Sequence, residues 1–139
     1  RALWSGEPVT RDSPYYPLRD AIGLPRPEPA PRIIVGGQSP GGARLAASVG
    51  DGWTTRPDLL DDLLPLYREA VATCGRDPGP VIVAWEGGRA GVDGLDGSPW
   101  IFDPAGEWER WQERGATGVV LVARTTADVD RLVDAAARW

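Results

Sequence analysis

Residues 33–42 read Ile33-Ile34-Val35-Gly36-Gly37-Gln38-Ser39-Pro40-Gly41-Gly42 and combine a short apolar run, a glycine-rich turn and the start of a helix. β-branched runs that end in glycine are typical of strands, and a hydroxyl followed by proline is typical of a helix start. In such a turn the backbone N–H groups can approach a phosphate, and the helix N-terminus adds a favourable dipole. The stretch therefore predicts a strand over 32–36, a helix over 40–49 and an anion-binding turn between them.

The same order of apolar run and helical pattern recurs three more times along the chain. The further runs lie at 52–55, 81–86 and 118–123, and helical spacing of apolar residues follows each of them. Strands that alternate with helices indicate an α/β fold with a parallel sheet and helical crossovers. Because a closed (β/α)8 barrel needs eight such units and about 250 residues, the four units here predict either an open sheet or half of a TIM-type barrel.

Several local features carry further expectations. Pro65 lies inside the second helical pattern, so the helix either kinks there or gives way to a second helix. Cys74, the single cysteine, is expected to be a small core residue near the end of that helix, and a reactive thiol is the alternative. The glycine-rich loop over 87–98 follows a buried strand and is expected to be functional. The last helix is expected to carry four apolar residues on one face: Val129, Leu132, Val133 and Ala136.

Residues 1–31 form a leader that precedes the repeating units. Residues 2–4 read as a helix end stopped by Ser5-Gly6, and two extended pieces near 7–10 and 15–18 flank a turn. Alternating prolines from Pro25 to Pro31 predict an extended connector, because proline excludes helix. The expected domains are therefore a leader over 1–31 and four strand–helix units over 32–139.

Composition narrows the classes of function. The chain has 139 residues and a net charge of −5, which argues against nucleic acid or an anionic membrane as a partner. No apolar run reaches the roughly 18 residues that span a bilayer, so we expect a cytoplasmic protein. The absence of histidine excludes Ser-His-Asp and Cys-His catalysis, and no metal site is predicted. Chemistry must come from carboxylates, arginines, hydroxyls or a bound cofactor.

Several segments, taken in order, resemble the bacterial luciferase-like monooxygenase family. They are Leu3-Trp4-Ser5-Gly6-Glu7-Pro8-Val9-Thr10, Tyr15-Tyr16, the proline-rich connector, Pro31-Arg32-Ile33-Ile34-Val35-Gly36-Gly37, Leu45-Ala46-Ala47 and Asp51-Gly52-Trp53. The resemblance covers residues 1 to about 75 in detail and the remainder only in element order. It implies a barrel that uses FMN or the deazaflavin coenzyme F420, with the strands of this chain as the last four. The family's first four strands, which carry many catalytic groups, would then be absent.

The resemblance also implies roles for residues near the first turn. In the family this turn contacts the phosphate region of the cofactor, so the resemblance implies cofactor binding by Gly36, Gly37, Gln38 and Ser39. A plain strand–helix turn without a ligand is the alternative. Trp53 is a further cofactor-binding candidate, either as a wall of the ring site or, alternatively, as a core aromatic.

Two residues that follow later strands are weak catalytic candidates, because functional groups of such barrels lie at the carboxyl ends of the strands. Glu86 would orient substrate or carry a proton, or it would simply pair with Arg89. Arg124 would bind an anionic group, or it would be a solvated charge at the rim.

Three hypotheses of function follow. The leading one is the C-terminal portion of a flavin- or deazaflavin-dependent oxidoreductase, either a monooxygenase or a hydride-transfer dehydrogenase, that acts on a small-molecule substrate. Such a half-barrel would associate with a missing N-terminal half-barrel or with itself. The second is a non-catalytic half-barrel fragment or binding module. The third is an open-sheet nucleotide-binding domain in which Asp58 would read a ribose, although Asp58 falls at a helix start.

Overall fold

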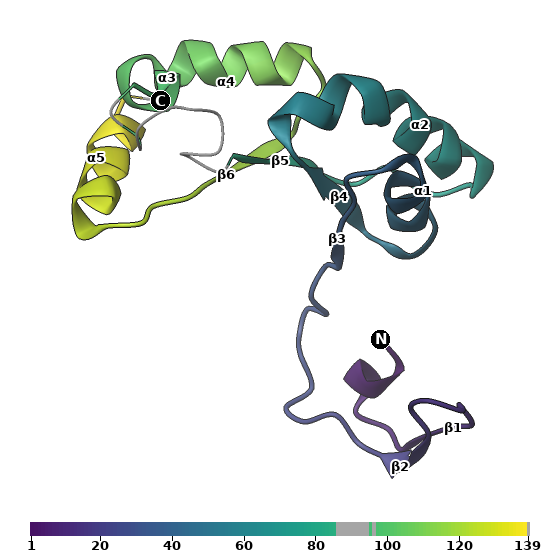
Figure 1. The fold of residues 1–139 in the computed structure, drawn as a ribbon. Helices are drawn as coiled ribbons and strands as arrows, with labels where there is room; N and C mark the ends of the chain where they lie inside the picture. The colour runs from purple at the N-terminus through teal and green to yellow at the C-terminus, as the bar shows by residue number, and fades with distance from the viewer. Residues whose placement is uncertain (86–94, 96, 139) are drawn as a thin grey trace. The chain divides into compact units, whose positions relative to one another are not determined.

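The computed structural model describes residues 1–85, 95 and 97–138 (Figure 1). The chain separates into two compact units, Arg1–Arg32 and Ile33–Trp139. The first unit is a short leader, and the second contains a parallel sheet with its helices. We describe each unit by itself.

The leader unit is a small hairpin with little burial. A 3-10 turn, η1 (Ala2–Ser5), ends at Gly6, whose φ of 78° is in the left-handed region that favours glycine. Strands β1 (Val9–Arg11) and β2 (Leu18–Ala21) then pair antiparallel. None of the residues 1–32 is buried, so local hydrogen bonds, and not an apolar core, hold this unit together.

The second strand of the hairpin begins later than the sequence indicates. Residues 15 and 16 are not extended, because the Ser13 hydroxyl accepts the N–H groups of Tyr15 and Tyr16 at 3.4 and 3.1 Å. This arrangement is a serine turn, which competes locally with strand formation. Both tyrosine side chains are more than four-fifths exposed.

The second unit is built on a four-stranded parallel sheet. Its strands are β3 (Ile34–Gly36), β4 (Gly52–Thr55), β5 (Val81–Trp85) and β6 (Gly118–Leu121), and they lie in the order β3-β4-β5-β6. Every neighbouring pair is parallel, as expected. Sheet order follows chain order without interruption, whereas an open nucleotide-binding sheet reverses its order at a switch point. The order therefore fits half of a TIM-type barrel and argues against the open-sheet hypothesis.

The helix expected over 40–49 has these bounds in the structure, and four further helices follow among the described residues. They are α1 (Pro40–Val49), α2 (Leu60–Thr73), α3 (Pro99–Phe102), α4 (Pro104–Glu113) and α5 (Thr126–Ala136). A 3-10 turn, η2 (Pro57–Leu59), precedes α2, so the chain changes helix type before Leu60, and α2 continues through Pro65. Helix α1 packs against α2, and α3 packs against α4 and α5 (Figure 1).

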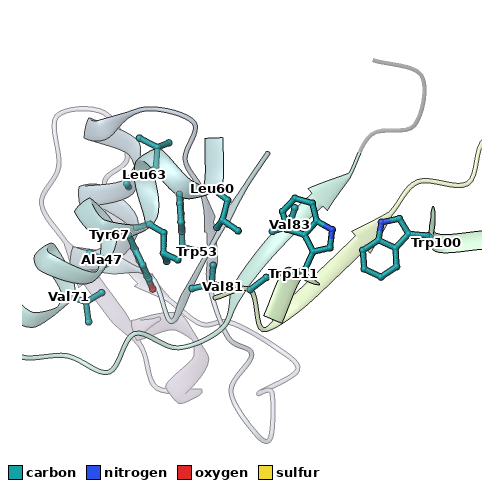
Figure 2. Packing of buried hydrophobic residues seen from close by; sticks show 14 residues of the cluster. Ala47, Trp53, Leu60, Leu63, Tyr67, Val71, Val81, Val83, Trp100 and Trp111 are labelled. Atoms are coloured by element: carbon teal, nitrogen blue, oxygen red, sulfur yellow. The ribbon is translucent and has the colours of Figure 1, made fainter. Parts of the chain in front are cut away.

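The core lies between the helices and one face of the sheet (Figure 2). Trp53 and Val81 are partners in neighbouring strands, and Val83 follows two residues later on the same face. All three are buried and belong to one cluster with Leu60 and Tyr67 of α2.

The opposite face of the sheet is much less covered. Thr54 and Ile82 are register partners on that face, as are Ala84 and Val120, and all four are only partly buried or exposed. The side chain of Val120 is 49% exposed. In a closed barrel this face points into the interior.

One expectation about the helices is wrong, and one helix is less covered than the others. Cys74 is exposed and not part of the core, because it is the C-cap of α2, where the chain leaves the packed surface. In α5 the residues Val129 and Val133 are 48% and 63% exposed, whereas Ala135 is buried. The reason is that α5 packs against α3, which covers only part of its apolar face.

Candidate functional site

Parallel pairing brings the carboxyl ends of the four strands to one edge of the sheet. Gly37, Gln38 and Ser39 follow β3 at this edge, and Arg124 follows β6. Strands β3 and β6 are three strand spacings apart, or about 14 Å along the sheet, so the first turn and Arg124 do not form one contact site. Glu86 and its alternative partner Arg89 lie outside the described residues.

The turn after β3 packs directly against the first turn of α1. The N–H of Gly37 donates to the carbonyl of Thr54 at 3.0 Å. A Cβ on Gly37 would lie only 2.6 Å from the carbonyl carbon of Gly42, so no larger residue fits there without displacing backbone. A Cβ on Gly41 would have no neighbour within 4 Å. The glycines therefore allow close backbone packing on one side of the turn and leave open space on the other.

The N-terminus of α1 has a hydroxyl cap but no carboxylate of its own. The Ser39 hydroxyl accepts the N–H of Gly42 at 3.1 Å, and the Ser39 carbonyl accepts the N–H of Ala43 at 2.9 Å. Pro40 has no N–H, and the first turn contains no acidic residue. Gln38 and Ser39 are exposed. The positive end of the helix dipole is thus accessible and is not neutralised within the helix.

Trp53 lies behind this turn and does not face a ligand. Its side chain is completely buried, and its indole Nε1–H donates to the carbonyl oxygen of Gly37 at 3.0 Å. The ring stacks on Tyr67 with centroids 5.0 Å apart and an interplanar angle of 22°. Figure 2 shows both rings side by side in the core. A buried indole cannot form the wall of a ring site, so the core alternative holds for Trp53, and its place in such a wall is corrected.

Thr55 is a polar residue at this edge that the sequence places beside Trp53, two positions further along the strand. It continues the β4 strand beyond Thr54, whose register partner is Gly36, and therefore lies opposite Gly37. Its side chain is 2% exposed, and its hydroxyl has no hydrogen-bond partner among the described residues. Because Thr55 shares the buried face of Trp53, this hydroxyl lies on the core side of the sheet.

The turn after β6 is closed by its own carboxylate. The N–H groups of Arg124 and Thr125 both donate to Oδ2 of Asp128 at 3.0 Å, and the Thr125 hydroxyl accepts the N–H of Asp128 at 3.1 Å. These backbone hydrogen bonds hold the pKa of the Asp128 carboxyl below its usual value. The side chain of Arg124 is exposed, which suits either of the two roles considered for it.

The opposite, amino-terminal edge of the sheet carries a structural network. The Arg76 guanidinium donates to the carbonyls of Ser48 and Gly50 at the end of α1, and Oδ2 of Asp51 accepts the N–H of Ile33 at 2.9 Å. The Tyr67 hydroxyl donates to the carbonyl of Pro78. Burial raises the pKa of the Tyr67 phenol, and the nearby positive charge of Arg76 opposes this shift.

The described part of the chain has neither a cluster of metal-binding side chains nor a membrane-spanning helix. Among residues 1–85, 95 and 97–138, no group of three His, Cys, Asp or Glu side chains could hold a metal ion. Within the same ranges, no helix has the length and apolar character needed to cross a membrane.

Consecutive parallel strands with helical crossovers, and polar turns gathered at the carboxyl edge, define a segment of a (β/α) barrel. Residues 1–88 match the luciferase-like monooxygenase family, and the chain belongs to that family. The resemblance seen in the sequence is thereby confirmed.

Individual relatives are F420-dependent enzymes by name. The F420-dependent glucose-6-phosphate dehydrogenase of Microbacterium testaceum is 35% identical over 79 residues, which are 53% of this chain and 24% of that protein. The F420-dependent hydroxymycolic acid dehydrogenase of Mycobacterium tuberculosis is 32% identical over 80 residues, which are 56% of this chain and 22% of that protein. The chain thus spans about a quarter of the length of these relatives.

A solved structure shows the same likeness. An F420-dependent secondary alcohol dehydrogenase, in complex with an F420-acetone adduct, superposes with a TM-score of 0.55 at 30% identity. The superposition covers 60% of this chain and 28% of that enzyme. The predicted half of a TIM-type barrel is therefore supported both by the sheet order and by a solved relative.

Proposed function

We propose that this chain is the part of an F420-dependent dehydrogenase that binds the phosphate region of the cofactor. The observation that carries the proposal is the turn over Gly36–Ser39. It combines close glycine packing, an exposed hydroxyl-capped helix N-terminus and no carboxylate in the first helical turn. A dianionic group is favoured at such a helix end because the dipole and the free N–H groups both stabilise it.

The described residues fit a phosphate at this turn. Gly36 and Gly41 leave space beside the backbone, since a Cβ on Gly36 would approach only the Thr54 methyl group, at 3.9 Å. Gln38 and Ser39 are exposed next to that space and can donate hydrogen bonds.

The relatives indicate the cofactor and the class of reaction. Their names specify F420, which favours F420 over FMN, and they specify dehydrogenases, which favours hydride transfer over oxygen insertion. We therefore infer a substrate with a hydroxyl-bearing carbon. When bound, the deazaflavin supplies the hydride acceptor for that carbon. The residues of this chain would anchor the phosphate of the cofactor and so fix the position of the ring over the substrate.

A binding titration tests the proposal. The chain is titrated with F420 and, separately, with FMN, and quenching of tryptophan fluorescence is measured. We expect saturable quenching with F420 and a higher affinity for F420 than for FMN. Absence of saturable binding of either ligand would contradict the proposal and would favour a non-catalytic half-barrel module.

The same reasoning leads to a proposal about the partner. Strands β3 and β6 are the edges of the described sheet, and the sheet face that carries Val120 is only partly covered. Apolar pairs on the outermost helices are also exposed: Leu45 and Val49 on α1, and Val129 and Val133 on α5. Unpaired parallel edges and apolar patches of this kind favour association. The occupant would be the N-terminal half of a barrel or a second copy of this chain.

Sedimentation velocity over a range of concentrations tests the association. We expect the chain alone to form dimers or larger species, and addition of an N-terminal half-barrel from an F420-dependent relative to produce a defined heterodimer. A chain that remains monomeric at high concentration, with or without that partner, would contradict the proposal.

A further inference from the structure

The peptide unit between Gly37 and Gln38 has a fixed orientation. Its carbonyl oxygen, on Gly37, accepts the buried indole N–H of Trp53 at 3.0 Å. The cis peptide bonds of the described chain precede Pro25 and Pro29, so this unit is trans. In a trans unit the C=O and N–H bonds point in opposite directions. Because the carbonyl is directed at the core, the N–H of Gln38 is directed away from it, toward the exposed side of the turn.

We infer that Trp53 is a positioning residue that holds the backbone N–H of Gln38 as a hydrogen-bond donor to the cofactor phosphate. The inference rests on the proposed function, because it concerns the same turn. It assigns Trp53 an action through the Gly37–Gln38 peptide unit, in place of direct contact with the ring.

The position of the indole is itself constrained from the other side. Trp53 stacks on Tyr67, and the Tyr67 hydroxyl is hydrogen bonded to the carbonyl of Pro78. The backbone of Gly37 is held by its hydrogen bond to Thr54 and by contact with Gly42. The indole is thus held on one side and the backbone of Gly37 on the other. The hydrogen bond between them leaves the Gly37–Gln38 peptide unit little freedom to rotate. A donor that is fixed before the ligand arrives loses less entropy on binding.

Tryptophan is suited to this role because its indole N–H is only a donor. An alternative donor at this depth, such as a hydroxyl, could also accept and would permit the reversed peptide orientation. Phenylalanine preserves an aromatic ring for the stack on Tyr67 but has no donor. The substitution Trp53→Phe therefore removes the hydrogen bond and retains most of the packing.

The experiment compares two ligands that differ only by a phosphate: the 5′-phosphate of the deazaflavin and the same deazaflavin without it. Wild type and Trp53→Phe are titrated with both ligands, and the ratio of the two affinities is taken for each protein. In wild type we expect the phosphorylated deazaflavin to bind more tightly than the phosphate-free one. In Trp53→Phe we expect this ratio to fall by roughly tenfold, the effect of one hydrogen bond to a charged group, while the affinity for the phosphate-free deazaflavin stays nearly constant.

Tyr67→Phe is the matched control. It alters the other member of the aromatic pair and removes a hydrogen bond at the opposite edge of the sheet. We expect it to lower stability but, because the aromatic ring beneath Trp53 and the Trp53–Gly37 hydrogen bond both remain, to lower the affinity ratio much less than Trp53→Phe does. A ratio near one in wild type would overturn the proposed phosphate site itself. A wild-type preference that Trp53→Phe retains in full would overturn only the inference about Trp53.

A second measurement on wild type avoids any dependence on the folding of the variant. Inorganic phosphate is titrated into the chain labelled with ¹⁵N, and the amide resonances of residues 36–43 are followed. We expect the Gln38 amide proton to shift downfield as phosphate binds. Shifts at Ser39 and Gly41 without one at Gln38 would contradict the assigned donor.

Discussion

Two strand–helix turns at the carboxyl edge of the sheet use the same architecture for opposite purposes. The turn after β3 opens α1 with Ser39, and the turn after β6 opens α5 with Thr125, and both hydroxyls cap their helices. The second turn also contains Asp128, whose carboxylate accepts two backbone N–H groups. The first turn has glycines in the corresponding space and no acidic residue.

Under the proposed function, the difference separates a binding turn from a structural one. Asp128 already occupies the place an anion would take at α5, so this helix start is satisfied internally. Among the described residues no side chain does so at α1, which supports the proposed binding of an external anion there. Since both turns have a hydroxyl cap, the proposal depends on the missing carboxylate and not on the cap.

The largest effect is expected from a substitution that disrupts the close packing of the turn after β3 against the start of α1. Gly37→Ala places a Cβ 2.6 Å from the backbone of Gly42, and we expect a loss of about 1–3 kcal/mol in the free energy of unfolding, together with loss of F420 binding. Denaturant unfolding and fluorescence titration measure the two effects. Gly41→Ala is the control: it has free space and should stabilise the helix by about 0.5–1 kcal/mol. Equal behaviour of the two variants would contradict the packing described here.

A second variant gives the first turn of α1 a carboxylate one position before the one that corresponds to Asp128 in α5, because the corresponding residue, Gly42, is too close to Gly37 to carry a side chain. Gly41→Asp adds a carboxylate to the first turn of α1, where nothing lies within 4 Å, so the helix should not be destabilised. We expect F420 affinity to fall about tenfold at low ionic strength because the carboxylate repels phosphate. The loss should shrink with added salt. Gly41→Asn, a neutral variant of the same size, should bind nearly as wild type does, and a similar loss in Gly41→Asn would rule out the electrostatic explanation.

The reciprocal change weakens the structural turn. Asp128→Asn removes the charge that accepts the N–H groups of Arg124 and Thr125, so we expect a lower melting temperature and unchanged F420 affinity. The pKa of Asp128 is lowered in the folded state. Its stabilising effect is therefore present above the unfolded-state pKa and disappears as the pH falls through the folded-state pKa. Melting curves of the two proteins should converge in acid, and a constant difference at all pH values would contradict this.

The smallest effect on stability is expected at the amino-terminal edge of the sheet, where the Tyr67 hydroxyl donates to the carbonyl of Pro78. Burial raises the pKa of Tyr67, so the folded protein holds the phenolic proton more tightly than the unfolded chain. The resulting stability is fully present below the ordinary tyrosine pKa of about 10 and is lost as the pH rises toward the folded-state value. Tyr67→Phe should lose about 0.5–1.5 kcal/mol at neutral pH and should lack this alkaline decline. An equal loss of stability with rising pH in wild type and Tyr67→Phe would contradict this explanation.

Local signals predicted the elements of the sheet and most helix ends. Helix α1 has the predicted bounds, and Asp103 and Thr125, which cap α4 and α5, are residue types that commonly open helices. Glycine also ends α2, with Gly75 at a φ of 61°. These features depend on neighbouring residues only, and such interactions are visible in a single sequence.

Features that depend on packing between elements were not predictable in the same way. Alternation along β4 assigns Trp53 and Thr55 to the same face, but only the packed structure shows that this face meets the helices. The exposed positions of Val129 and Val133 depend on the contact of α5 with α3, and α3 itself was not expected. The sequence of α5 shows which of its residues lie on one apolar face. Which other element packs against α5 depends on distant parts of the chain and cannot be read from that sequence.

The uninterrupted strand order has a consequence for how such a protein is made. Each strand pairs with the one that leaves the ribosome just before it, so the sheet can grow one unit at a time during translation. A gene divided between two units would separate only the pair of strands on either side of the break and would leave every other pair of this sheet within one chain. Fission and fusion of genes at such boundaries are therefore tolerated by this architecture more readily than by sheets whose adjacent strands come from distant parts of the chain.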